Sequence, residues 1–192
     1  MFEIYRKSAD GTGTEEAVLV TANDKYPLSI SPDGNTLLFS TSDPNTQADL
    51  WLSPLQDPKG AKPFVVSPFA ENQGTISPNG RWVAYQSDDS GKSEIYVADF
   101  PGGGNRVQAS TDGGSEPVWS RNGKELFYRS GKKFMSVPVK AGALFVPDPA
   151  HVLFESDFVT QSEQGIAAYD VSLDGQRFYL VEEDSKKVVK QD

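Results

Sequence analysis

The chain offers few residues of the types that perform covalent or metal chemistry. It has 192 residues, no cysteine and a single histidine, His151. Thiol nucleophiles, thiolate metal sites and clusters of histidine ligands are therefore excluded. A Ser-His-Asp triad would have to use His151, but no Gly-x-Ser-x-Gly segment is present to hold a serine on a sharp turn. We predict no catalytic residues, no cofactor and no metal site.

Carboxylates are the more abundant candidates for chemistry. A calcium site built from Asp88, Asp89 or Asp112 is conceivable, but the chain lacks the Asp-x-Asp-x-Asp-Gly loop pattern. A pair of carboxylates for glycoside hydrolysis stays open, because acidic residues occur in many loops. The segment Pro101–Gly104 lacks the Lys-Ser/Thr that follows a phosphate-binding loop, so we interpret it as a turn.

The charge balance limits the possible partners. With 27 acidic and 18 basic side chains the formal net charge is -9, which argues against nucleic acid or an anionic membrane as partner. No apolar run is long enough to span a bilayer, so we expect no membrane insertion. The first residues lack the basic start and apolar middle of a signal peptide. We expect a soluble protein, cytoplasmic or, if upstream sequence is missing, periplasmic.

The elements that must position any site come from an internal repeat. The pattern Ser-x-[Asp/Asn]-Gly occurs four times, and its glycines, Gly34, Gly80, Gly123 and Gly175, lie 46, 43 and 52 residues apart. A second signature, an acidic residue followed by aliphatic and aromatic residues, follows two of these turns at Asp49 and Glu94 and is degraded at Lys133; a copy without a preceding turn begins at Glu3. A period of about 40–50 residues made of short strands and tight turns is typical of β-propeller blades.

The residue types of the repeat explain how it folds. Asp-Gly or Asn-Gly between apolar strands accepts positive φ, which predicts a two-residue hairpin turn. The strand that follows each turn is a nearly continuous apolar run, such as Trp82–Tyr85. Such a run suits a strand covered on both faces, as in a blade that lies between two others. We predict an all-β fold, a propeller of four-stranded antiparallel blades.

The repeat divides residues 1–192 into one partial propeller domain. Three full blades are expected, preceded by a half blade with the third and fourth strands and followed by a half blade with the first and second strands. A tail at residues 186–190 would add a weak third strand. The expected boundaries are 2–22 (half), 25–67, 72–111, 115–155 and 166–190 (half).

These residues carry a resemblance to a known family. Ser-Pro-Asp-Gly turns followed by Asp/Glu-Ile/Leu-Trp/Tyr resemble the WD-like repeats of the TolB family of bacterial β-propellers. The segment from Glu94 through Ser120, and the later runs 125–130 and 169–178, are similar to the last blades of propellers that follow Ser/Thr protein kinase domains. The resemblance covers nearly the whole chain and implies the fold, while such propellers serve many roles. The family's propellers have six or more blades, and this chain has material for about four.

The two half blades are complementary, which leaves three arrangements open. Within one chain they would make a fourth blade closed by strand exchange. Between two chains they would make two shared blades of an eight-bladed homo-oligomeric ring. The chain is alternatively a piece of a larger propeller. An open half-ring would expose blade faces and strand edges, which favours aggregation, so we expect self-association into a closed ring.

We expect the functional surface at the ring face and the channel mouth, where loops lead into the first strand of each blade. We favour a non-catalytic scaffold that binds a protein or peptide, with a basic or amphipathic segment fitting aromatics among acidic loops. A small-ligand sensor or a hydrolase- or lyase-type propeller enzyme at the channel mouth is the first alternative, and a structural fragment without independent activity is the second. The predicted binding residues are Tyr26, Phe69, Glu71, Asn72 and Glu116.

Overall fold

The computed structural model describes residues 2–140, 142–156 and 167–181. These residues form five antiparallel sheets, three of four strands and two of two strands, with one short 3-10 turn, η1 (Pro58–Gly60). The predicted all-β fold class is confirmed. No helix in the described ranges is both long and apolar enough to cross a bilayer. The tail at residues 186–190, predicted as a third strand, lies outside the described residues.

The strands follow chain order within each sheet. The first two-stranded sheet is β1 (Ile4–Arg6) and β2 (Glu16–Leu19). The four-stranded sheets are β3 (Lys25–Ile30), β4 (Thr36–Asp43), β5 (Gln47–Pro54) and β6 (Lys62–Val65); β7 (Glu71–Ile76), β8 (Trp82–Ser87), β9 (Glu94–Asp99) and β10 (Val107–Gln108); and β11 (Ser115–Trp119), β12 (Glu125–Ser130), β13 (Lys133–Pro138) and β14 (His151–Glu155). The last sheet is β15 (Tyr169–Val171) and β16 (Phe178–Leu180).

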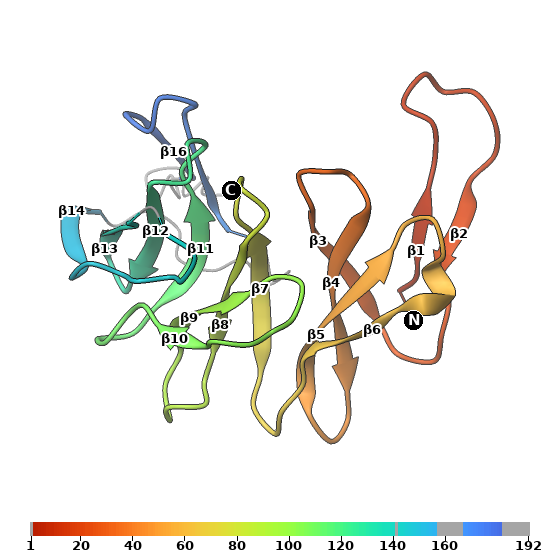
Figure 1. Ribbon diagram of the computed structural model, residues 1–192, viewed down its shortest axis with the longest axis horizontal. Helices are drawn as coiled ribbons and strands as arrows, with labels where there is room; N and C mark the ends of the chain where they lie inside the picture. The colour runs from red at the N-terminus through yellow and green to blue at the C-terminus, as the bar shows by residue number, and fades with distance from the viewer. Residues whose placement is uncertain (1, 141, 157–166, 182–192) are drawn as a thin grey trace, which may run out of the picture.

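The sheets stand side by side along an open arc, with β1 and β2 at one end and β11–β16 at the other (Figure 1). The hydrophobic core is accordingly split into four clusters, each between two consecutive sheets. Burial of apolar surface between neighbours, rather than within one sheet, holds the arc together. The clusters centre on Ile4, Val18, Leu37 and Phe39; on Leu38, Leu50, Val83 and Tyr85; on Trp82, Val97, Trp119 and Leu126; and on Phe127, Phe134, Tyr169 and Val171.

The second strand of each four-stranded sheet contributes to two clusters at once. In β8, Trp82 and Ala84 face the β11–β14 sheet, while Val83 and Tyr85 face the β3–β6 sheet. Side chains alternate between the two faces of a strand, so a continuous apolar run is needed where both faces are covered. This confirms the interpretation of the apolar runs as strands between two neighbours.

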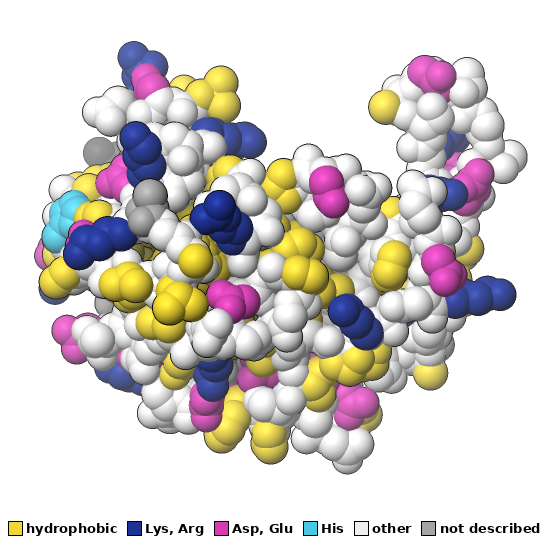
Figure 2. Space-filling view, viewed as in Figure 1, with side chains coloured by type: hydrophobic (Ala, Val, Ile, Leu, Met, Phe, Trp, Pro, Cys, Tyr) yellow, Lys and Arg dark blue, Asp and Glu magenta, His cyan; other side chains and the backbone are white. Residues whose placement is uncertain are grey.

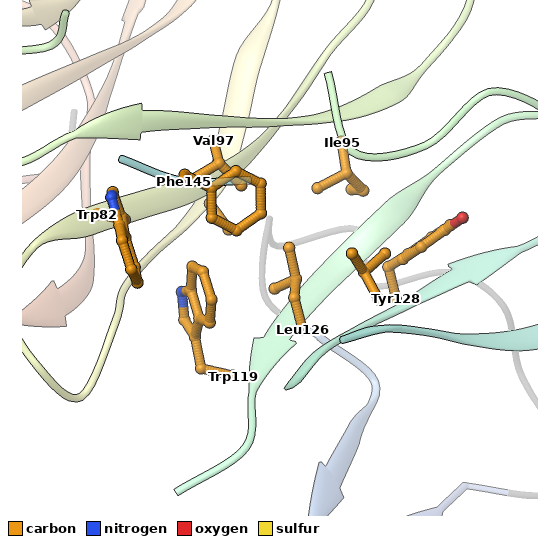
Figure 3. Close-up of a cluster of buried hydrophobic side chains, with 9 residues drawn as sticks. Trp82, Ile95, Val97, Trp119, Leu126, Tyr128 and Phe145 are labelled. Atoms are coloured by element: carbon orange, nitrogen blue, oxygen red, sulfur yellow. The ribbon is translucent and has the colours of Figure 1, made fainter. Parts of the chain in front are cut away.

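The largest cluster joins the β7–β10 and β11–β14 sheets and contains two tryptophans (Figure 3). The rings of Trp82 and Trp119 are stacked with centroids 6.3 Å apart, and Phe145 meets both edge-on. The indole Nε1 of Trp119 donates a hydrogen bond of 3.1 Å to the carbonyl oxygen of Thr75 in the neighbouring sheet. The interface therefore combines aromatic packing with a hydrogen bond that sets the position of one sheet against the next.

The repeated turns correct the prediction of two-residue hairpins. In each turn only the glycine has positive φ, between 65° and 73°, and the preceding Asp or Asn does not. The Ser77 turn shows the alternative: four residues separate Ser77 from Trp82, and the hydroxyl of Ser77 accepts a bond of 3.0 Å from the N–H of Trp82 and donates to Asn79 Oδ1. The serine, which we had treated only as part of the motif, therefore closes the loop. The same bonds recur at Ser31, Ser120 and Ser172.

The two short sheets remain separate at the two ends of the arc (Figure 1). Among the described residues, β1 pairs only with β2, and β16 pairs only with β15. The described residues thus do not form a fourth blade closed within one chain. The space-filling view shows a wide hollow between the two ends (Figure 2).

Candidate functional site

The arc has two distinct rims. We call one the connection face: it carries the connections that lead into first strands, at residues 20–24, 66–70 and 109–114, and the hairpin loops 44–46 and 88–93. The other, the turn face, carries the four Ser-x-[Asp/Asn]-Gly turns. The predicted binding residues come from the connections and first strands, so the connection face is the candidate site.

Tyr26 forms the first aromatic group of this face. Its side chain is 37% exposed, and its ring lies 5.7 Å from that of Phe2, which is 60% exposed. The N–H of Phe2 donates to Asp24 Oδ1 at 2.6 Å, and the N–H of Lys25 donates to the carbonyl oxygen of Phe2. These bonds fix the chain start against β3, so that two aromatic rings and a carboxylate share one surface. Sequence reasoning missed Phe2, because only the fold brings it to Tyr26.

Phe69 lies in the next connection and is also 37% exposed. Its N–H donates to Ser67 Oγ at 3.1 Å, and the N–H of the following Ala70 donates to Asp88 Oδ1 at 2.9 Å. The adjacent loop contributes a third bond, from Gln47 Nε2 to the carbonyl oxygen of Pro68. The backbone that carries Phe69 is thus held on both sides while its ring stays accessible.

Glu71 does not reach the surface. It is 1% exposed, and its Oε1 accepts a bond from Ser67 Oγ at 2.5 Å. Burial raises the pKa of Glu71, the bond from Ser67 opposes this, and the nearby Asp49 raises it further. Burial likewise raises the pKa of Asp49, which is 2% exposed. Two buried carboxyl groups therefore hold the connection from inside, and Glu71 is placed to position Phe69 rather than to meet a partner directly.

Glu116 joins two sheets. It is 1% exposed and has a φ of 57° at a bulge of β11. Its N–H donates to Gln73 Oε1 at 2.7 Å, and its own Oε2 accepts from the N–H of Ala168 at 3.2 Å. Gln73 occupies the equivalent position of β7, four residues before the turn serine, and also has positive φ. Each of these two side chains therefore accepts a hydrogen bond from the backbone at the equivalent position of the following sheet. The bonds connect consecutive sheets along the inner edge of the arc.

Burial raises the pKa of Glu116, and the Ala168 bond and the charge of Arg129 oppose this. Arg129 is 2% exposed and lies 4.0 Å from Glu116 Oε2. Asn72, which precedes Gln73 in β7, is half-buried. Of the five predicted residues, the structure thus exposes Tyr26 and Phe69, leaves Asn72 partly accessible, and buries Glu71 and Glu116.

The acidic residue of the second repeat signature is structural. Glu94, at the start of β9, is fully buried. Its carboxylate accepts bonds from Ser110 Oγ and from the N–H of Gly113, and it lies 3.1 Å from Lys92 Nζ. One side chain of the third strand therefore holds the connection to the following sheet, which explains why an acid begins this signature.

The other candidates for chemistry do not converge. His151 is exposed at the start of β14. Asp88 accepts from the N–H of Ala70, and Asp89 pairs with Arg106, whose guanidinium lies 3.8 Å from the Tyr96 ring. Within the described ranges no group of three or more His, Cys, Asp or Glu residues is placed to hold a metal ion. The segment Pro101–Gly104 forms a turn between β9 and β10, as predicted.

Two open depressions lie at the turn face. One, of about 450 Å³, is bordered by Arg121, Asp170, Asp174 and Arg177. The other, of about 570 Å³, is bordered by Arg81, Asp99 and Phe100. Both are shallow, and neither is bordered by a predicted binding residue.

Comparison with known sequences identifies no relative: no protein-family model and no curated protein matches the chain. Solved structures do match. TolB from Acinetobacter baumannii superimposes with a TM-score of 0.68 at 20% identity, over 95% of this chain and 43% of that one. A structure assigned to TolB of Agrobacterium tumefaciens gives 0.64 at 16% identity, over 80% and 56%.

The chain has the fold of a TolB-like β-propeller. An oligogalacturonate lyase solved in complex with manganese matches as well, with a TM-score of 0.63 at 13% identity over 91% of this chain and 52% of that one. Identities this low establish the fold and not the activity. The chain spans about half the length of the structures it matches, in agreement with the open arc.

Proposed function

We propose that the chain is a non-catalytic binding module that holds a basic or amphipathic segment of a protein partner on its connection face. Tyr26 and Phe69 are the contact residues, with Asn72 beside them. Glu71 and Glu116 act as positioning residues, because their carboxylates are buried and bonded within the chain. The supporting observation is that two aromatic side chains stay 37% exposed on one rim although the backbone around each is held by hydrogen bonds.

The charge of this rim suits a basic partner. Asp24 and Asp112 lie in its loops and Asp43 ends β4 beside them, and the backbone hydrogen bond from Asn45 lowers the pKa of Asp43, so that it stays ionised at neutral pH. Aromatic residues dominate the energy of protein interfaces, while carboxylates around them guide association and choose partners by charge. The buried acids that would otherwise suggest catalysis each accept a structural hydrogen bond on at least one carboxyl oxygen, which favours binding over an enzymatic role.

A labelled peptide tests this proposal. Fluorescence anisotropy would follow binding of a short fluorescein-labelled peptide of lysine and leucine, with a glutamate and leucine peptide as the control ligand. We expect the basic peptide to bind more tightly, and Phe69→Ala or Tyr26→Ala to weaken its affinity about five- to thirtyfold, the loss of about 1–2 kcal/mol usual for a truncated aromatic anchor.

The matched control is Val146→Ala, which truncates an apolar side chain that is 50% exposed in the connection between β13 and β14. It should leave the affinity unchanged. Asp43→Asn should weaken binding of the basic peptide mainly at low salt, because the side chain is partly exposed and its charge is screened. Equal affinity for both peptides, or equal effects of Phe69→Ala and Val146→Ala, would reject the connection face as the binding surface.

A further inference from the structure

The two ends of the arc expose positions that are buried or, at Trp51 and Met135, half-buried in the complete sheets. In the second strands, the fourth residue after the turn glycine is Leu38, Ala84 or Phe127, none more than 2% exposed; its equivalent in β16 is Tyr179, which is 62% exposed. In the third strands, the second residue after the acidic position of β9 is Tyr96, 6% exposed; its equivalent in β1 is Tyr5, 53% exposed. Among the described residues, the outer face of each terminal sheet therefore has no neighbouring sheet packed against it.

The two ends also present complementary strand edges. In every complete sheet the second strand pairs with the third, through Phe39 opposite Trp51, Tyr85 opposite Tyr96 and Tyr128 opposite Met135. Among the described residues, β16 is a second strand without a third, and β1 is a third strand without a second. An unpaired strand edge is a template for another strand, and each end presents the partner that the other needs.

We propose that β16 of one copy of this chain pairs with β1 of a second copy, and β1 of the first with β16 of the second. Transferring the register of the complete sheets places Leu180 opposite Tyr5 and Tyr179 opposite Arg6. Each junction becomes a four-stranded sheet of β15, β16, β1 and β2. Two chains then give six complete and two shared sheets, a closed ring of eight blades, which is within the range known for propellers.

A second copy is the occupant because the two edges of one chain stand at opposite ends of the arc and in separate sheets (Figure 1). The pairing would continue the packing already present: the Phe127, Phe134, Tyr169 and Phe178 cluster borders the open edge of β16. A head-to-tail contact that closes after two copies leaves no free edge, whereas one that does not close forms filaments. This inference concerns the ends of the arc and is independent of the proposed function of the connection face.

Engineered disulfides give a direct test, because the chain has no native cysteine that could form other disulfides. Two double variants of the full chain are needed: Tyr5→Cys with Leu180→Cys, and Arg6→Cys with Tyr179→Cys. Neighbouring pairs in an antiparallel ladder alternate in geometry, so at least one pair should meet the distance that a disulfide requires. We expect oxidation to give a covalent dimer of twice 20.9 kDa on a non-reducing gel, and reduction to reverse it.

The control is Arg6→Cys with Leu180→Cys, which is out of register by one residue. Adjacent strand positions face opposite sides of a sheet, so this pair should not cross-link. Circular dichroism of each variant checks that the strands are kept. Tyr5 and Tyr179 are mostly exposed, whereas Leu180 packs against the Phe127 and Phe134 cluster, so the Arg6 and Tyr179 pair is the one that leaves the core intact.

Other outcomes overturn the proposal. An intramolecular disulfide in a monomer would show that one chain closes on itself, and a ladder of larger species would show an open head-to-tail polymer. If cross-linking appears only after residues 182–192 are deleted, these residues occupy the β16 edge in the 192-residue chain. Equal cross-linking of the out-of-register pair would mean random collision rather than a specific pairing.

Discussion

The interior sheets and the two terminal half sheets contain the same sequence module in different surroundings. In β8 five of six residues are buried, whereas in β16 none is fully buried. Yet the Ser172 turn that leads into β16 keeps the bonds of the interior turns, including 2.9 Å from the N–H of Arg177 to the serine hydroxyl. Local hydrogen bonding thus follows from the local sequence, while burial depends on a neighbouring sheet, as expected for a repeat protein.

The first prediction contrasts core residues of the two regions. Trp119→Ala removes a stacked ring and its hydrogen bond to Thr75 between two interior sheets, so the free energy of unfolding should fall by about 3–5 kcal/mol. Tyr179→Ala, in the terminal sheet, should change it by less than about 0.5 kcal/mol at dilutions where single copies predominate. Urea denaturation followed by circular dichroism measures both. Similar losses would show that β16 is packed as tightly as the interior.

The second prediction contrasts the turns. Ser77 is 1% exposed and bonds both Asn79 and the N–H of Trp82. Ser77→Ala leaves buried groups without partners and should cost about 1–2 kcal/mol of unfolding free energy. Ser172→Ala removes the same bonds in a more exposed turn, where water can replace them, and should cost about 0.5 kcal/mol or less. A larger loss of unfolding free energy for Ser172→Ala than for Ser77→Ala would mean that burial of the turn does not determine the effect.

The third and smallest effect is on pH dependence. Burial raises the pKa of Glu71 above its ordinary 4.5. Because the folded chain then holds this proton more tightly than the unfolded chain, the contribution of Glu71 to stability is present below pH 4.5 and is lost as the pH rises through the raised value. Glu71→Gln should therefore flatten the decline in unfolding free energy between mildly acidic and neutral pH.

Replacing Asp174, in the turn of the terminal sheet, should change the pH dependence of stability in the opposite direction. The hydrogen bond from Ser172 lowers the pKa of Asp174, so its contribution is present above the ordinary value and is lost as the pH falls through the lowered one. Asp174→Asn should alter the unfolding free energy only at acidic pH, and only slightly, because the carboxyl group is exposed. Denaturation at a series of pH values checks both variants, and a common shift in one direction would contradict the assigned environments.

Much of the fold could be predicted, because propeller blades repeat short local signals. The apolar run at Trp82–Tyr85 and the glycine of each turn locate strands and turns without knowledge of their neighbours. The prediction of the turn geometry was wrong. Asp-Gly suggests a two-residue loop, whereas the serine hydroxyl forms hydrogen bonds that close a four-residue loop.

The candidate site was less predictable. Tyr26 and Glu71 lie near the starts of the first strands β3 and β7, and both types suit a binding surface, but only the fold shows that Tyr26 is accessible while Glu71 turns inward to Ser67. The pairing of Phe2 with Tyr26 joins residues that are distant in sequence. Exposure and long-range contact depend on neighbouring sheets, and single-sequence patterns do not contain this information.

The account depends most on what covers the two terminal sheets. Multi-angle light scattering coupled to gel filtration, at low micromolar concentration, measures the mass of the unmodified chain in solution. If β1 and β16 pair between copies, the mass is twice 20.9 kDa, with no larger species. A homogeneous peak of 20.9 kDa would contradict the two-chain ring and leave the ends of the arc open.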